Sequence, residues 1–209
     1  MQNAPPFRLA KVAEADFPTA WGHFRIFGFE GHFAYGVEEA LVLKMGDLAP
    51  ESGKPAPLVR VHSQCLTGDV FHSLRCDCRA QLELVLQSIS DEGRGLLIYE
   101  HQEGRGIGLL NKLRAYELQD RGLDTIEANE RLGFASDLRS YKLPAEIARY
   151  FMELYGMREI RFMSNNPQKV DALEAVGVMV ERVPSLVPAV ASRQAYLDTK
   201  RDRMGHLLG

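Results

Sequence analysis

The sequence predicts an α+β fold with mixed α/β layers, in which a β-rich N-terminal part precedes alternating helices and strands. Up to about residue 65, aromatic and β-branched side chains are frequent and glycine and proline separate the runs, as in a set of strands. From Arg79 onward, short apolar runs alternate with segments whose apolar residues recur at helical spacing. Such alternation is typical of an α/β layer, which we expect to pack on the β-rich part.

Strands account for the N-terminal part. Each expected strand is a run of residues with high β propensity, bounded by residues that favour turns. In chain order, the expected strands are Phe7–Glu14, His23–Phe29, Glu38–Lys44 and Leu58–His62.

Helices and strands alternate in the rest of the chain. Ala80–Ser90 is apolar at helical spacing and should end near Gly93, because glycine suits a left-handed cap. Leu96–Tyr99 is expected to be a strand, and Ile107–Gln119 an amphipathic helix that ends near Gly122. The remaining expected elements are the helix Pro144–Tyr155, the strand Glu159–Met163, the helix Pro167–Ala175 and the strand Val178–Val183.

The C-terminal tail is polar and basic. A loop is expected from Pro184 to Ala191, and a short helix near Tyr196–Leu208. We therefore expect one domain over residues 1–190 and a tail over residues 191–209.

Composition narrows the class of protein. The 209 residues are 45% apolar and 25% charged, as in ordinary soluble domains, and the net charge is -3. No basic run is present that would hold a nucleic-acid backbone, so an anionic ligand needs a local cluster of cations. No apolar run approaches the roughly 20 residues of a membrane span, and the start lacks the features of a secretory signal. The odd count of three cysteines excludes a full disulfide framework, so we expect a reducing, cytoplasmic setting.

The three cysteines lie close together in sequence, as Cys65 followed by Cys76-Asp77-Cys78. Zinc prefers thiolate and imidazole ligands, and three protein ligands with one open position are typical of a catalytic site. The alternatives are buried apolar thiols, or a closed structural site with His62 or His72 as the fourth ligand.

Two strand-to-helix junctions could bind phosphate. Glu103–Gly108 is rich in glycine and opens a helix, where free amides attract anions and Arg105 could add a charged hydrogen bond. The spacing differs from G-x-G-x-x-G, so this signal alone is weak. At the second junction Asn166 suits the N-cap and Pro167 the first helical position. Lys169 in that first turn opposes the helix dipole and indicates either a nearby anion or a solvated side chain.

Taken together, these segments resemble the GTP cyclohydrolase II family, whose enzymes begin riboflavin synthesis. The likeness runs through nearly the whole chain in the family's order, which makes it far more specific than any single motif. The matching segments are Arg60–Asp69, Arg75–Cys78, Gln102–Asn111, Asp124–Asn129, Leu132–Ala135, Asp137–Arg139, Asn165–Pro167, Tyr196–Lys200 and Gly205-His206.

The resemblance implies a reaction on GTP. Pyrophosphate is released, the imidazole ring is opened, and C8 leaves as formate. The remaining product is 2,5-diamino-6-(5-phosphoribosylamino)pyrimidin-4(3H)-one. The resemblance also implies one Zn²⁺ per chain, Mg²⁺ with the triphosphate, and a homodimer.

The resemblance also implies roles for residues at matched positions. The zinc ligands would be Cys65, Cys76 and Cys78. Asp137 would be the proton acceptor, Arg139 would attack the α-phosphate, and Tyr116 would lie near the ring-opening chemistry. The contacts to GTP would be Arg60, Val61, His62, Ser63, Gln64, Gln81, Glu103, Gly104, Arg105, Thr125, Ser164 and Lys169.

Local patterns alone favour simpler roles for several of these residues. Asp137 could be a turn residue, Thr125 part of a loop, Tyr116 a core tyrosine and Gln81 a solvated side chain. Arg139 poses a chemical difficulty, because a guanidinium stays protonated to about pH 12 and is a poor nucleophile. From chemistry we expect Arg139 to hold phosphate charge instead.

The chain departs from the usual family pattern at five positions. Gln64 stands where glutamate is common, Arg79 where glycine is common, and His101 where arginine is common. Ser140 replaces an acid, and Ser164 replaces a threonine while keeping the hydroxyl. These changes leave the proposed zinc ligands in place but affect the expected rate and product.

Three rival functions follow from the same residues. An enzyme of the same chemistry could stop at the formylated product, although the presence of Tyr116 argues against it. A zinc deaminase would need H-x-E or C-x-E with P-C-x-x-C, and this chain has C-x-C without that glutamate. A non-catalytic zinc and nucleotide-binding module would not need Asp137 and Arg139.

Overall fold

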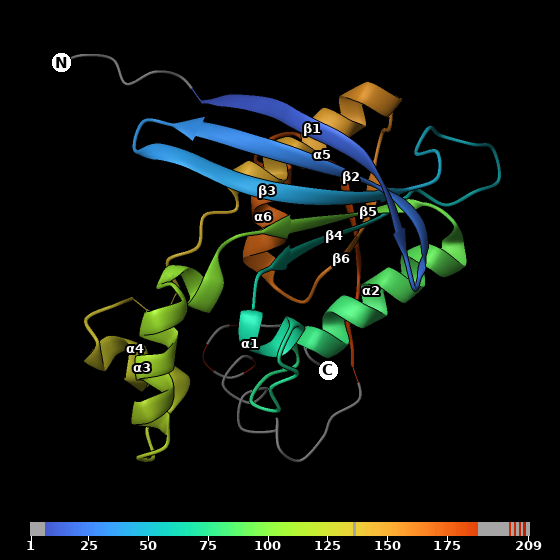
Figure 1. The fold of residues 1–209 in the computed structure, drawn as a ribbon. Coiled ribbons are helices and arrows are strands. Elements are labelled where there is room, and N and C mark those ends of the chain that lie inside the picture. The colour runs from blue at the N-terminus through green and yellow to red at the C-terminus, as the bar shows by residue number, and fades with distance from the viewer. Residues whose placement is uncertain are drawn as a thin grey trace.

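A single mixed sheet organises the protein (Figure 1). The computed structural model describes residues 7–135 and 137–187, together with residues 201, 203, 205 and 207. Within these residues, seven strands lie in the order β1-β2-β3-β5-β4-β6-β7. Their bounds are β1 Arg8–Thr19, β2 Gly22–Phe33, β3 Gly36–Met45, β4 Leu58–Ser63, β5 Gly95–Glu100, β6 Ile160–Met163 and β7 Val180–Val183.

The sheet has an antiparallel half and a parallel half. Strands β1, β2, β3 and β5 pair antiparallel, whereas β5, β4, β6 and β7 pair parallel. The α+β class is confirmed, but the β-rich part and the alternating part share one sheet and do not stack as separate layers. Strand β3 pairs with β5, so the backbone groups on that edge of β3 have hydrogen-bond partners. If the β-rich part formed a separate layer, this edge would be unpaired.

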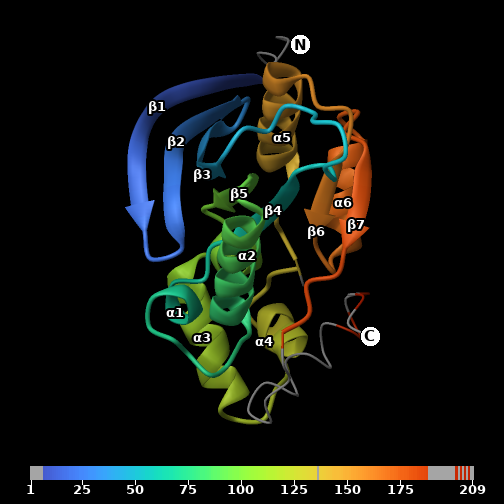
Figure 2. The same ribbon diagram turned by 90° about the vertical axis from the view of Figure 1, so that its right-hand side faces the viewer.

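Helices cover both faces of this sheet. They are α1 (Leu66–Asp69), α2 (Cys78–Glu92), α3 (Leu109–Gln119), α4 (Thr125–Arg131), α5 (Lys142–Tyr155) and α6 (Pro167–Glu174), with a 3-10 turn η1 at Glu103–Gly106. Helices α1, α3 and α4 lie beyond the carboxyl ends of β4 and β5 (Figure 2). None of the helices within the described residues is long and apolar enough to cross a bilayer.

Two apolar clusters hold the layers together. On one face of the sheet, Val59 and Val61 of β4 pack with α5 and α6. On the other face, Leu58 of β4 and Leu97 of β5 pack with Val85 and its neighbours on α2. Because successive side chains of a strand point to opposite faces, one buried strand contributes to both clusters.

The strands and helices predicted between Phe7 and Val183 are present, with shifted ends, and two α-helices were missed. Asn166 caps α6 with Pro167 in its first turn, and Gly93 ends α2 in the left-handed conformation, as predicted. Helices α1 and α4 were not predicted, and Thr125 begins α4, which rules out the alternative that it is a loop residue. Asp124 and Glu127 form a capping box there, a sequence signal that would have indicated the helix.

The tail is only partly described. Residues 184–187 have no regular structure, in agreement with the start of the predicted loop. The predicted helix near Tyr196–Leu208 lies outside the described residues, apart from the isolated positions 201, 203, 205 and 207.

Substitution of Phe151 tests whether the larger apolar cluster stabilises the fold. The Phe151 side chain has 0% exposure and meets the ring of Phe27 edge-on, with the centroids 5.4 Å apart. We expect Phe151→Ala to lower the free energy of unfolding by about 3–5 kcal/mol, because the cavity cannot close fully. Leu154→Ala on the same helix, where the side chain is 57% exposed, should change it by about 0.5 kcal/mol or less. Urea unfolding followed by circular dichroism measures both variants, and equal losses would contradict the assigned core.

Candidate active site

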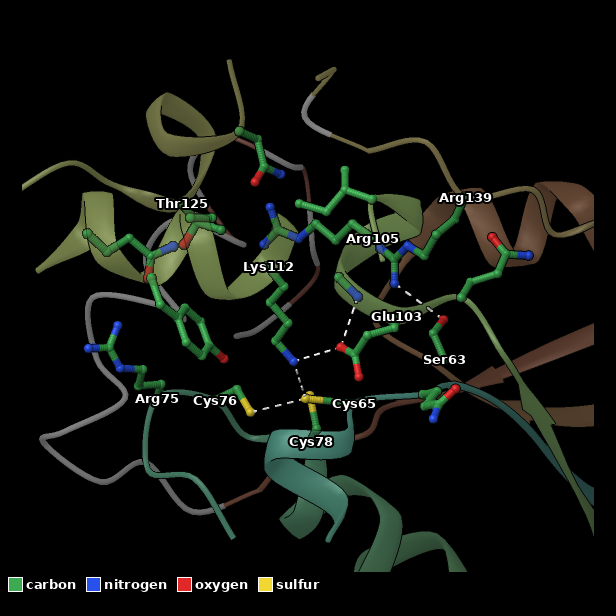
Figure 3. A pocket seen from close by; sticks show the side chains of 18 residues that line it. Ser63, Cys65, Arg75, Cys76, Cys78, Glu103, Arg105, Lys112, Thr125 and Arg139 are labelled. Atoms are coloured by element: carbon green, nitrogen blue, oxygen red, sulfur yellow. Dashed lines mark hydrogen bonds and ion pairs between the residues drawn. The ribbon is translucent and has the colours of Figure 1, made fainter. Parts of the chain in front are cut away.

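The three cysteine sulfurs form a compact cluster (Figure 3). Cys65 follows β4, and Cys76 and Cys78 lie at the start of α2. All three Sγ atoms are within 4.8 Å of one another, and those of Cys65 and Cys76 are 3.7 Å apart. Zn–S bonds of about 2.3 Å in a tetrahedron place sulfurs about 3.8 Å apart, so this spacing fits zinc.

Gly68 makes room for this cluster. A Cβ atom at Gly68 would lie 2.9 Å from the sulfur of Cys76 and 3.1 Å from that of Cys65. Both distances are too short for a side chain that packs against sulfur without moving it. The need for glycine here arises from close approach to the thiols.

A buried carboxylate shapes the loop that carries Cys65. Asp69 Oδ2 accepts hydrogen bonds from the backbone N of Cys65 at 3.1 Å and from the hydroxyl of Tyr99 at 2.9 Å. His62 Nε2 lies 3.2 Å from both carboxylate oxygens. Arg79 Nη1 donates to the carbonyl oxygen of Asp69 at 2.8 Å. These hydrogen bonds hold the loop that carries Cys65.

The histidines considered as fourth ligands lie outside the sulfur cluster. Among the described residues, the group that could hold a metal contains only the three cysteines. His62 pairs with Asp69, and burial lowers the pKa of its imidazole although Asp69 opposes the shift. His72 is exposed. The structure therefore favours three protein ligands and one open position.

Lys112 connects the sulfur cluster to the glycine-rich turn. Its Nζ lies 3.0 Å from Cys65 Sγ and 2.7 Å from Glu103 Oε1, while Glu103 Oε2 accepts from the backbone N of Leu66 at 2.6 Å. Hydrogen bonds from Cys76 and Cys78 lower the pKa of Cys65, and the charge of Lys112 adds to the effect. Sequence reasoning missed Lys112, although it lies four residues before Tyr116 on the same face of α3.

Tyr116 also borders the sulfurs and is not a core residue. Its hydroxyl is 3.3 Å from Thr67 Oγ1, and the guanidinium of Arg75 lies 4.6 Å from the centre of its ring. Burial raises the pKa of the phenol, so it stays protonated at neutral pH. The phenol is therefore a hydrogen-bond donor close to the metal-binding end of the pocket.

The glycine-rich turn carries an arginine whose terminal nitrogens are unsatisfied within the described part of the chain. Nη1 and Nη2 of Arg105 are buried, and neither has a hydrogen-bond partner among the described residues. The backbone of Arg105 is left-handed, with φ of 60°, which costs a non-glycine residue about 1–2 kcal/mol. A strained residue that aims an unsatisfied cation into a pocket is typical of a binding site for an anion.

Arg139 is held by Asp137. Its Nε donates to Asp137 Oδ1 at 2.9 Å and its Nη2 to Oδ2 at 2.5 Å, and Nη1 lies 3.3 Å from Ser63 Oγ. Burial opposes ionisation of Asp137, but the hydrogen bonds and charge of Arg139 lower the pKa of that carboxyl overall. Burial opposes the charge of Arg139, but the hydrogen bond and the charge of Asp137 raise the pKa of the guanidinium overall.

One pocket brings many of the predicted residues together. The sulfur cluster lies at one end, with Lys112 Nζ next to Cys65, and Arg105 and Arg139 lie at the other (Figure 3). Tyr116 also lines the pocket. The predicted residues that line the pocket are Ser63, Gln64, Cys65, Cys76, Cys78, Glu103, Gly104, Arg105, Tyr116, Thr125 and Arg139.

Other predicted contacts are not among the residues that line this pocket. Arg60 donates to the carbonyl oxygen of Met163 at 2.8 Å and to Gln81 Oε1 at 2.5 Å. Lys169 Nζ donates to the carbonyl oxygen of Val61 at 3.0 Å and to Ser63 Oγ at 3.1 Å, and burial lowers its pKa to about 7. The predicted residues outside the lining are Arg60, Val61, His62, Gln81, Asp137, Ser164 and Lys169.

Comparisons of the whole sequence with known proteins point to one family. The sequence model of the family described as GTP cyclohydrolase II matches residues 10–184. A GTP cyclohydrolase-2 of Citrobacter koseri is 52% identical over 203 residues, which cover 97% of this chain and 99% of that protein. A GTP cyclohydrolase-2 of Escherichia coli O9:H4 is 52% identical over 202 residues, which cover 96% of this chain and 98% of that protein. The structural match to a solved two-domain 3,4-dihydroxy-2-butanone 4-phosphate synthase from A. baumannii covers 84% of this chain and 40% of that protein's chain. Its TM-score of 0.45 and identity of 15% are too low to carry an argument.

The family match spans most of the chain, and the relatives match it over nearly their whole length. The chain belongs to the GTP cyclohydrolase II family.

Proposed function

We propose that the chain is a zinc-dependent GTP cyclohydrolase II that begins riboflavin synthesis. It hydrolyses GTP to 2,5-diamino-6-(5-phosphoribosylamino)pyrimidin-4(3H)-one, formate and pyrophosphate. The observation that supports this best is the pocket with three sulfurs at one end and two arginines at the other. A purine at the sulfur end and a triphosphate at the arginine end match this distribution of charge.

Cys65, Cys76 and Cys78 would hold Zn²⁺, which at an open position supplies a water with a pKa near 7. Lys112 offsets the negative charge of Cys65 and orients Glu103. The proposed role of Tyr116, whose protonated phenol lines the pocket, is to donate a hydrogen bond to a ring nitrogen as the imidazole opens.

The cations at the far end of the pocket would bind the triphosphate. Nη1 and Nη2 of Arg105 have no hydrogen-bond partner in the described ranges of the chain. Arg139 is oriented by Asp137, and its Nη1 lies 3.3 Å from Ser63 Oγ. We assign Arg139 to the charge that develops as pyrophosphate leaves, because its pairing with Asp137 keeps the guanidinium protonated. Asp137 remains the proposed proton acceptor, in a later hydrolytic step.

The remaining predicted residues divide into two groups. Ser63, Gln64, Gly104 and Thr125 line the pocket and are proposed to contact GTP. The other six do not line the pocket, although Lys169 donates to the lining residue Ser63. Their proposed role is to bind GTP directly or to support the residues that do, and they are Arg60, Val61, His62, Gln81, Ser164 and Lys169. We further propose that Mg²⁺ accompanies the triphosphate and that the enzyme is a cytoplasmic homodimer with one catalytic domain over residues 1–190.

A product assay tests the proposed function. With zinc and magnesium, the purified protein should convert GTP to formate, pyrophosphate and a pyrimidine that absorbs at a longer wavelength than GTP. Separate enzymatic assays measure formate and pyrophosphate. Pyrophosphate with a formylated product would support the enzyme that stops early, and binding of GTP without either release would support the non-catalytic module.

Loss of one sulfur tests the metal site. Cys76→Ser should remove bound zinc and slow formate release by more than about 100-fold, exceeding the usual effect of a change outside the ligand shell. Metal content is measured by mass spectrometry of the purified variant, and circular dichroism checks that it is folded. Ser88→Ala on α2, where the hydroxyl donates to the carbonyl oxygen of Leu84, is the control and should keep its zinc. Full zinc content and full activity in Cys76→Ser would refute the ligand assignment.

A further inference from the structure

The sulfur ligands of the proposed metal come from two segments of the chain. Cys65 follows β4, whereas Cys76 and Cys78 lie at the start of α2. Three thiolates in close contact repel one another, so other contacts must hold the two segments at the separation that a metal requires. This inference rests on the proposed function, because it concerns the same metal.

Asp69 binds both polar backbone groups of Cys65. Its Oδ2 accepts a hydrogen bond from the backbone N of Cys65 at 3.1 Å, and its own backbone N donates to the carbonyl oxygen of Cys65 at 2.7 Å. Because Asp69 is buried, water does not compete for these bonds. With the backbone of Cys65 held on both sides, the position of its sulfur depends on rotation about one side-chain bond.

The carboxylate of Asp69 is in turn tied to the sheet. The hydroxyl of Tyr99 donates to Oδ2 at 2.9 Å, and His62 Nε2 lies 3.2 Å from both carboxylate oxygens. His62 on β4 and Tyr99 on β5 are opposite each other in the parallel pairing, and their rings stack with the centroids 5.5 Å apart. Since the two strands position these side chains, the strands also position the carboxylate that holds Cys65.

Arg79 connects Asp69 to the second segment. It follows Cys78 directly in the chain, and its Nη1 donates to the carbonyl oxygen of Asp69 at 2.8 Å. Its Nε donates to Glu83 Oε1 at 2.6 Å, one turn further along α2, which orients the guanidinium. A continuous set of contacts therefore runs from the backbone of Cys65 through Asp69 and Arg79 to Cys78.

We propose that Asp69 is a positioning residue for the metal and that, with Arg79, it sets the separation of Cys65 from Cys78 before the metal binds. A site that is already arranged loses less free energy to reorganisation when its ligand arrives. Residues that hold metal ligands in this way commonly change metal affinity by about 10–100-fold. Arg79 stands where glycine is common in the family, so this part of the arrangement belongs to this chain.

Zinc affinity of the purified full chain tests the role of Asp69. It is measured by competition with a chromophoric chelator, and the absorption of the cobalt-substituted protein reports the geometry at the sulfurs. Asp69→Leu has a similar volume but no acceptor, so we expect zinc to bind at least about 10-fold more weakly and the cobalt bands to shift. Asp69→Asn keeps one oxygen for the backbone N of Cys65 and should restore the affinity to within about 3-fold.

Arg79→Ala tests the connection to α2 and decides the question alone if Asp69→Leu does not fold. The Arg79 side chain is partly exposed, so its removal leaves no buried cavity. Loss of its hydrogen bond to Asp69 should weaken zinc binding by about 3–10-fold. Arg149→Ala on α5 is the matched control, because Arg149 likewise donates to a glutamate of its own helix, and it should bind zinc as the unaltered chain does.

Two results would overturn the proposal. One is a folded Asp69→Leu or Arg79→Ala protein with unchanged zinc affinity and cobalt absorption. The other is an Asp69→Asn protein that binds zinc as weakly as Asp69→Leu. A merely structural role would lower the free energy of unfolding, measured with urea, without altering the affinity of the folded protein. Failure of the proposed function is recognised separately, because the unaltered chain would then bind zinc and release no formate.

Discussion

The parallel pairing of β4 with β5 is the constraint on which the rest of the site depends. It sets Ser63 opposite Glu100, so the chain leaves both strands at the same level of the sheet. The chain beyond β4 carries Cys65, and the chain beyond β5 forms the turn at Glu103–Gly106. Carboxyl ends of parallel strands that lie side by side are a common place for ligands, because the loops that follow them converge.

Charge is distributed locally within this site. The chain has a net charge of -3, yet the pocket contains Arg105, Lys112 and Arg139. Lys112 pairs with Glu103, and Arg139 with Asp137, so these two cations are positioned before any ligand arrives. Arg105 has no hydrogen-bond partner among the described residues and keeps its donors for an anion. Preorganised charge of this kind lowers the cost of reorganisation when a phosphate binds.

Much of this arrangement could be predicted from the sequence, because its signals are local. The spacing of Cys65, Cys76 and Cys78 indicated a metal site, and Asn166-Pro167 indicated the start of α6. Pairing partners are not local, so the union of both halves in one sheet through β3 and β5 was missed.

Residues that act through a fold-dependent contact were also missed. Asp69, Glu100 and Lys112 are separated in sequence from several of the groups they contact, and nothing near them indicates those contacts. Their roles depend on the loop geometry beyond the strands. Lys169 donates to Ser63 Oγ for the same reason. Its position in the first turn of a helix had indicated only a nearby anion or a solvated side chain.

The proposed chemistry depends most directly on a metal with three sulfur ligands and one open position. X-ray absorption at the zinc edge of the purified protein measures this arrangement. We predict three sulfur neighbours at about 2.3 Å and one oxygen, without the scattering of an imidazole. Four sulfur or histidine ligands from the protein, or a protein that folds and turns over GTP without zinc, would contradict it.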